Sequence, residues 1–249
     1  MQSANSGRMR GMVRLSQKTF IVSGSKAADW RTLLSIALLF TLAGCGSGQL
    51  NYDVDYTVLS LQPGDLEANG IGFLTPAAAT GSETDKQALA QSFSKSLEAA
   101  RPNVRIRGLA DVLNGINQAD LDQQYKEMYR DYLQTGILDA NVLKDVQQVT
   151  GVRYLAQLSL AGFSQDDQRR LSILGLRLVD TKKGNLRIFL QIWDANRGAV
   201  VWEGSVELSY AYDTGRETPV SFSDLCDRAA TRLFLSLPGA NSGADLLAQ

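Results

Sequence analysis

Cys45 is the side chain whose surroundings most clearly indicate a chemical modification. It ends the segment Leu42-Ala43-Gly44-Cys45, in which small residues lead up to a thiol. An apolar run at residues 33–42 leads into this segment, and six Lys or Arg residues precede the run. A basic flank and a short apolar run are typical of a secretory signal, and the run is too short to span a bilayer as a helix. A cysteine directly after the cleavage point is typical of the bacterial lipobox, in which that thiol receives lipid.

The sequence therefore predicts that residues 1–44 are a lipoprotein signal peptide, cleaved between Gly44 and Cys45. Cys45 of the mature chain would carry diacylglycerol and a fatty acyl chain such as palmitate, which would anchor the protein in a membrane. Gly46, rather than an acidic residue, follows the cysteine, so we expect the outer membrane and a domain that faces the periplasm. Two other interpretations stay open, a soluble secreted protein and a signal anchor with a chance cysteine.

The other polar side chains do not form a recognisable catalytic pattern. The chain has no histidine, which excludes Ser–His and Cys–His pairs and imidazole zinc sites. It also lacks the Gly-rich phosphate loop and the G-x-S-x-G nucleophile motif. Glu203 and Glu207 share a predicted strand face but lie about 13 Å apart, too far for a carboxylate pair. Asp53 and Asp55 lack the rest of a calcium loop. We therefore expect no enzyme, no cofactor and no metal.

Composition and charge place the mature chain among ordinary globular domains. Removal of residues 1–44 leaves 205 residues, with 19 basic and 25 acidic side chains. This length can build a hydrophobic core, and the acidic balance argues against a nucleic-acid partner. Cys226 would be the one cysteine left beside Cys45. Its helical apolar setting predicts a small core residue, with intermolecular pairing or reactivity as the alternatives.

The spacing of apolar residues predicts a single α/β domain at residues 53–238. Cys45 and a short tether occupy residues 45–52 before it, and a disordered tail follows at 239–249. Strands are expected at residues 56–61, 71–74 and 104–107, and helices between Ser82 and Pro102, across 109–150, and from Ser221 to Pro238. The side chains expected to be deeply buried are Phe93, Leu97, Val146, Tyr154, Leu158, Leu190, Ile192, Leu225 and Leu233.

From Arg153 onward the apolar period changes from 3.6 to 2, which predicts a meander of at least four strands. Turns are expected at residues 165–167 and in two Asp-x-x-x-Gly segments, 180–184 and 194–198. In such a turn the aspartate can bond its own backbone and the glycine supplies a positive φ. The predicted fold is a single mixed, mostly antiparallel sheet that is covered by helices on one side.

One strand of the meander offers a candidate surface for a protein partner. Arg187, Phe189, Gln191 and Trp193 alternate with apolar residues and so share the face opposite the core. Arginine and aromatic side chains are enriched at interface hot spots, so Arg187, Phe189 and Trp193 are the candidate partner-binding residues. The alternative is that helices cover this face too.

Three segments carry a likeness to a known group of proteins. They are residues 71–76 (IGFLTP), 149–155 (VTGVRYL) and 176–184 (LRLVDTKKG). Together with the order of elements, they resemble envelope lipoproteins of the group that includes CsgG, LpoB and the amino-terminal domain of TolB. The resemblance covers roughly residues 68–237. It implies non-enzymatic roles as scaffolds, export pores or activators of wall synthases, and it supplies no catalytic residues.

The function expected from the sequence is a lipid-anchored scaffold that binds a protein of the cell envelope. The alternative is a subunit of a curli-type secretion pore or export machinery, and a homo-oligomer is compatible with both. A curli-type exporter adds hairpins whose membrane-spanning strands need about nine to eleven residues. We expect every long strand pair to belong to the domain's own sheet, which argues against the pore.

Replacing Cys45 with serine should abolish lipid attachment, because the hydroxyl cannot replace the lipobox thiol. The wild-type protein should fractionate with membranes and show a lipid mass increment, whereas Cys45→Ser should be unprocessed or released. A wild-type mature protein whose mass shows no lipid would overturn the lipobox prediction.

Overall fold

The structure is a computed structural model that describes residues 49–78, 83–173, 176–214 and 221–240. By its contacts the chain divides into two units, Met1–Cys45 and Gly46–Gln249, and the described residues all belong to the second. The predicted signal peptide, its cleavage site at Gly44 and Cys45, and residues 241–249 of the predicted tail lie outside the described residues.

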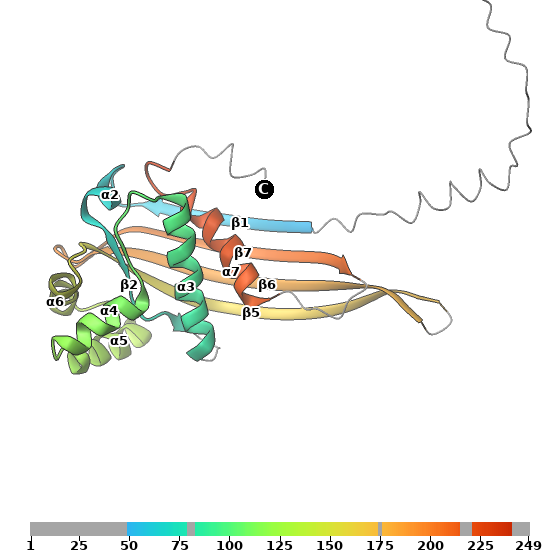
Figure 1. The fold of residues 1–249 in the computed structure, drawn as a ribbon, viewed down its shortest axis with the longest axis horizontal. Helices are drawn as coiled ribbons and strands as arrows, with labels where there is room; N and C mark the ends of the chain where they lie inside the picture. Colours follow the sequence, from blue (N-terminus) through green and yellow to red (C-terminus); the bar gives the residue numbers. More distant parts are fainter. Residues whose placement is uncertain (1–48, 79–82, 174–175, 215–220, 241–249) are drawn as a thin grey trace, which may run out of the picture. The chain divides into compact units, whose positions relative to one another are not determined.

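A single mixed sheet forms the centre of the domain (Figure 1). Its strands are β1 (Gln49–Val58), β2 (Ile71–Phe73), β3 (Ala77–Ala78), β4 (Ile106–Arg107), β5 (Tyr154–Ile173), β6 (Leu176–Asp194) and β7 (Ala199–Thr214). They lie in the order β1-β7-β6-β5-β2-β4, with β3 also beside β5. The pairs among β1, β7, β6 and β5 are antiparallel, whereas β2, β3 and β4 pair in parallel. The predicted fold class is confirmed.

Six helices are described, and α6 and α7 begin at residues whose side chains cap them. They are α2 (Asp65–Asn69), α3 (Glu83–Ala100), α4 (Leu109–Gln118), α5 (Asp122–Thr135), α6 (Ala140–Thr150) and α7 (Phe222–Phe234). The Asp139 carboxylate accepts the N–H groups of Asn141 and Val142 at the start of α6. The Ser221 hydroxyl accepts the N–H of Asp224 at the start of α7. Each cap satisfies backbone donors that have no partner within the helix.

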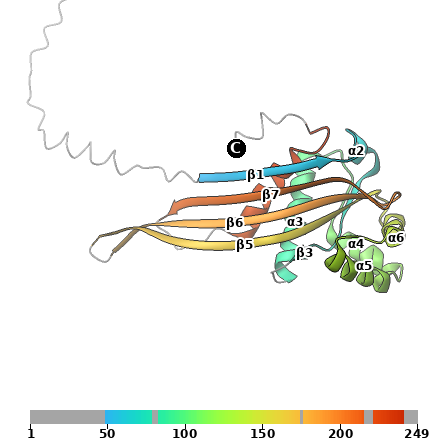
Figure 2. The same ribbon diagram turned by 180° about the vertical axis from the view of Figure 1, so that it is seen from behind.

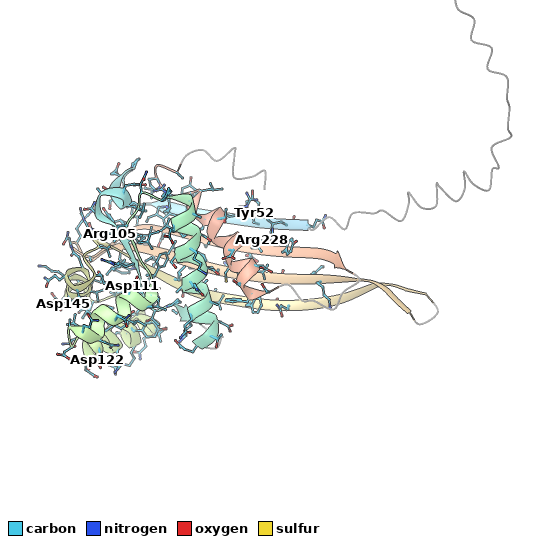
Figure 3. The ribbon with its side chains drawn as sticks, in the orientation of Figure 1. Tyr52, Arg105, Asp111, Asp122, Asp145 and Arg228 are labelled. Atoms are coloured by element: carbon cyan, nitrogen blue, oxygen red, sulfur yellow. The ribbon has the colours of Figure 1, made fainter. Side chains whose placement is uncertain are left out.

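Helices α3 and α7 lie side by side across one face of the sheet and bury the larger core (Figure 1). Phe93 of α3 and Phe234 of α7 meet edge to face, with their ring centroids 5.6 Å apart. At the edge of this core, Arg228 and Arg232 of α7 lie over the rings of Tyr210 and Tyr52 (Figure 3). All nine side chains that the sequence predicts to be deeply buried are buried.

A second, smaller core lies on the opposite face, where α4, α5 and α6 cover one end of the sheet. Its members include Leu155 and Trp193, which are register partners on β5 and β6. The expectation that helices cover one side alone is therefore wrong at this end. The strands here carry apolar residues on both faces, and burying the second face requires a second helical layer.

The meander has three long strands, because two of the predicted turns lie inside β5 and β6. Residues 165–167 of β5 pair with residues 182–184 of β6 in one ladder. Its register sets Asp166 opposite Lys183 and Asp167 opposite Lys182. Backbone pairing of these two segments in one continuous ladder outweighs the turn preference of Asp and Gly.

The third predicted turn is confirmed between β6 and β7. The Asp194 carboxylate accepts the N–H of Asn196 at 3.0 Å, and Gly198 adopts a φ of 60°. A Cβ on Gly198 would lie 2.4 Å from that of Ala140, so both the backbone angle and the neighbouring helix require glycine.

Strand β1 begins earlier than the sequence predicts. Residues 49–52, expected in the tether, pair with β7, and the strand ends at Val58 instead of residue 61. Leu50 and Val54 pack against the larger core, which explains why the strand extends to this end.

The β5–β6 hairpin is longer than expected, with 20 residues in β5 and 19 in β6. Both strands belong to the domain's own sheet, as the sequence analysis expects of every long strand pair. The first residue of β1, Gln49, lies in the same row as Asp166 and Lys183. Seven residues of each strand, 167–173 and 176–182, continue past this row. Because a membrane-spanning strand needs about nine to eleven residues, the length of this part still argues against a spanning hairpin.

An ion pair joins the two strands at the base of this hairpin. The Arg153 guanidinium donates to both oxygens of the Asp194 carboxylate, at 3.0 and 2.7 Å. The Asp194 side chain is 2% exposed. Burial alone would raise the pKa of Asp194, but the hydrogen bonds and charge of Arg153 outweigh it and lower the pKa.

Replacing Asp194 with asparagine should destabilise the domain by about 1.5–3 kcal/mol, because it removes a charge-assisted bidentate pair in a buried position. The lowered pKa means that Asp194 stabilises the wild type above about pH 4 and that this contribution is lost as the pH falls through the folded-state pKa. The variant should therefore lose less stability on acidification than the wild type, as measured by urea unfolding at several pH values. Asp122→Asn, which removes an exposed pair with Lys126 (Asp122 is labelled in Figure 3), should have a much smaller effect on stability at neutral pH. Parallel pH profiles for wild type and Asp194→Asn would contradict this assignment.

Truncating core leucines should be costly, because the cavity left behind cannot fully collapse. Leu190→Ala and Leu233→Ala should each lower the free energy of unfolding by about 2–5 kcal/mol. Both side chains are buried, whereas Leu133 on α5 is 54% exposed. Leu133→Ala is thus the matched control, expected to change stability by less than about 0.5 kcal/mol in the same denaturant titration. Equal losses in the three variants would refute the core assignment.

Candidate functional site

On this second face, α4, α5 and α6 lie at one end of the sheet, and no described helix covers the rest of the face (Figure 2). Register defines two neighbouring rows of residues on this face, each crossing β5, β6, β7 and β1. The first row is Gln157, Gln191, Glu203 and Thr57, and the second row is Ser159, Phe189, Ser205 and Asp55. These two rows, together with Arg187 from the row after them, are called the open face.

A cavity of about 350 Å³ lies over the two rows. All eight row residues line it, and Tyr132 of α5 lines it from the helical layer. The Tyr132 hydroxyl donates to Oε1 of Gln191 at 3.4 Å, which ties α5 to the sheet. Burial raises the pKa of Tyr132, so the hydroxyl remains a neutral donor.

Gln157, which lines this cavity, has an unpaired acceptor. Its side-chain amide donates to the backbone oxygens of Thr75 and Leu158, at 3.0 Å each. Both partners are carbonyl oxygens, so the amide group cannot be turned round without losing both bonds. Gln157 is 1% exposed, and its Oε1 has no hydrogen-bond partner among the described residues. A buried acceptor without a partner costs free energy unless a ligand or water supplies a donor.

Two of the three predicted partner-binding residues lie on the open face. Phe189 is 40% exposed, and Arg187 is exposed with its guanidinium 5.4 Å from the Phe189 ring centroid. Trp193 is 5% exposed and belongs to the second core, so its prediction as an exposed docking residue is wrong. The alternative that helices cover this face is correct for Trp193 and wrong for Phe189 and Arg187.

The carboxylates of the open face are residues that the sequence does not bring together. Asp55 and Glu203 are 148 positions apart in the chain but occupy diagonal positions on β1 and β7. In the next row, Arg187 on β6 pairs with Glu207 on β7, and Glu207 pairs with Asp53 on β1. Within the described residues, no group of three or more His, Cys, Asp or Glu side chains could hold a metal ion. The site is therefore acidic without forming a metal cage.

Cys226 lies on the other face of the sheet from the open face. Its side chain is completely buried in the larger core, and burial raises the pKa of the thiol. A buried thiol with a raised pKa is a poor nucleophile, so the prediction of a small core residue is confirmed.

None of the described helices combines the length and apolar character needed to cross a membrane. No protein-family model matches the chain, and no curated protein matches it in sequence.

Solved structures show distant likeness in fold. The chain is similar to the PelC dodecamer from Paraburkholderia phytofirmans, with a TM-score of 0.39, 14% identity, and coverage of 78% of this chain and 99% of that chain. It is also similar to Lipoprotein GNA1162 from Neisseria meningitidis, with a TM-score of 0.35, 13% identity, and coverage of 66% and 96%. A PDZ domain protein from Parabacteroides distasonis aligns with a TM-score of 0.32 and 10% identity, covering 85% of this chain and 41% of that chain. Likenesses this distant establish neither a family nor a function.

Proposed function

We propose that this chain is a lipid-anchored protein of the bacterial cell envelope that binds a protein partner through the open face and catalyses no reaction. The observation that carries the proposal is the uncovered part of the sheet beside a helical layer that covers the rest of that face. The layer stops short of Phe189, which leaves an aromatic ring and the neighbouring Arg187 in contact with solvent.

The composition of this face is suited to a protein interface. Aromatic and arginine side chains dominate interface hot spots, and a polar rim commonly surrounds them. Phe189 and Arg187 supply the first kind of group, while Ser159, Ser205 and Thr57 supply hydroxyls around them. The open face contains no histidine and no cysteine, and its two carboxylates are Asp55 and Glu203.

The proposed anchor restricts where the partner can be. Cys45 lies four positions before Gln49, the first residue of β1. Four residue steps span at most about 14 Å, so a lipid on Cys45 would keep β1 close to the membrane surface. The partner is accordingly a membrane-associated envelope protein, and we place the anchor in the outer membrane, facing the periplasm.

Site-specific photo-cross-linking in cells tests this function. A photoreactive residue at Ser205, on the open face, should form an adduct with one protein of defined mass, and Phe189→Ala should reduce that adduct about tenfold or more. Leu133→Ala removes a comparably exposed apolar side chain from α5 and should leave the adduct unchanged.

Melting temperatures should show that both variants remain folded. An adduct that survives Phe189→Ala would overturn the assignment of the open face. Adducts in which the photoreactive residue of one copy is joined to residues 167–173 of another copy would instead favour the export-subunit alternative.

A further inference from the structure

The cavity of the open face carries two carboxylates beside hydroxyl and amide groups. Asp55 and Glu203 contribute carboxylates, Gln157 contributes the unpaired Oε1, and Phe189 contributes the negative face of a ring. A carboxylate can only accept hydrogen bonds when it is ionised. The cavity is therefore complementary to a ligand that carries several donors, a positive charge and an apolar stem.

We infer that this cavity receives an arginine side chain presented by the protein partner. The inference rests on the proposed function, because it names the group by which that partner is recognised. The guanidinium would lie between Asp55 and Glu203, its stem would cross Phe189, and the backbone N–H of the same arginine would donate to Gln157.

The spacing of the carboxylates fits a planar cation with donors on two edges. Asp55 pairs with Ser205 and Glu203 pairs with Thr57, so the two acids are diagonal neighbours on adjacent strands. Diagonal positions are about 7–8 Å apart, and a guanidinium between them can donate to both carboxylates at once. Such charge-assisted, geometrically fixed bonds distinguish arginine from lysine, which carries a compact point charge.

The second part of the proposed recognition is a contact with the Phe189 ring, and the structure already contains one such contact. The Arg187 guanidinium lies 5.4 Å from the Phe189 ring centroid, within the range of a cation–π contact. The ring is 40% exposed even with Arg187 in place, so part of its surface is left for another side chain. Arg187 also adds a positive charge one row away, which opposes the binding of a second cation.

Gln157 marks the other end of the cavity. It lies on β5, two strands from Glu203 on β7, which is about 10 Å at ordinary strand spacing. An extended arginine reaches about 7 Å from its backbone nitrogen to its guanidinium carbon, and a hydrogen bond of about 2.9 Å at each end spans the rest. The unpaired Oε1 would therefore gain a donor from the partner's backbone and lose the penalty of burial without a hydrogen bond.

A titration of the full-length mature protein in neutral detergent micelles tests the inference. The probe is N-acetyl-L-arginine methylamide, and the control probe is the citrulline analogue, which has nearly the same shape but no charge. The arginine probe should bind in the millimolar range, as expected for a single side chain. It should shift the backbone amide signals of residues 189, 191, 203 and 205, and the citrulline analogue should bind at least about tenfold more weakly.

Matched variants separate the cavity from the general charge of the surface. Glu203→Gln and Asp55→Asn should each weaken probe binding about tenfold, because each removes one charge-assisted contact. Glu207→Gln and Asp53→Asn change the same residue types on neighbouring positions outside the cavity and should leave binding within about twofold. Arg187→Ala should strengthen binding, because it removes a like charge and frees the ring.

Equal binding of the arginine and citrulline probes, or equal loss in all four acid variants, would overturn the inference. Equal binding of n-butylammonium would do the same, since it would show recognition of any cation. If Glu203→Gln leaves the Ser205 adduct intact while Phe189→Ala abolishes it, the partner binds without an arginine anchor. The proposed function then stands and the inference falls.

Discussion

The continuous antiparallel ladder from β5 through β6 to β7 is the constraint on which the rest of the structure depends. Once the register is set, each residue of these strands is assigned to one face of the sheet. Leu158, Leu190 and their neighbours then require the layer of α3 and α7. Leu155 and Trp193 require the layer of α4 to α6 on the other side. The open face is the part of the sheet that neither helical layer covers.

The sequence allows much of this fold to be predicted, because helix periods and caps are local signals. Ser221 begins a helix as expected, and the alternation at residues 186–192 correctly identifies a half-buried strand. Two of the three predicted turns are wrong for a physical reason. Aspartate and glycine indicate a turn only where no neighbouring strand forms backbone hydrogen bonds with the same segment. At residues 165–167 and 182–184 each segment is the other's partner, and that pairing appears only in the folded register.

The candidate site can be predicted from the sequence only in part, because it too depends on pairing between segments that are distant in the chain. Phe189 and Arg187 follow from alternation along one strand, which is a local pattern. The covering of Trp193 depends on how α4, α5 and α6 pack on the sheet, and no local pattern encodes that arrangement. Asp55 and Glu203 meet through the pairing of β1 with β7, between segments far apart in the chain. The unpaired oxygen of Gln157 depends on a hydrogen bond to Thr75, which is equally remote in sequence.

Strand β1 forms one edge of the sheet, and its only strand neighbour among the described residues is β7. Its ten residues include the exposed rings of Tyr52 and Tyr56, so the free edge combines unpaired backbone groups with apolar surface. Such an edge is a template for uncontrolled strand addition and aggregation, which charged residues suppress. Asp53 and Asp55 supply that protection, and the proposed lipid anchor would concentrate many copies of the edge in the plane of a membrane. Asp55 would then have a role at the edge besides the one proposed in the cavity, and a variant that loses its charge would also lose part of the barrier that keeps neighbouring molecules apart.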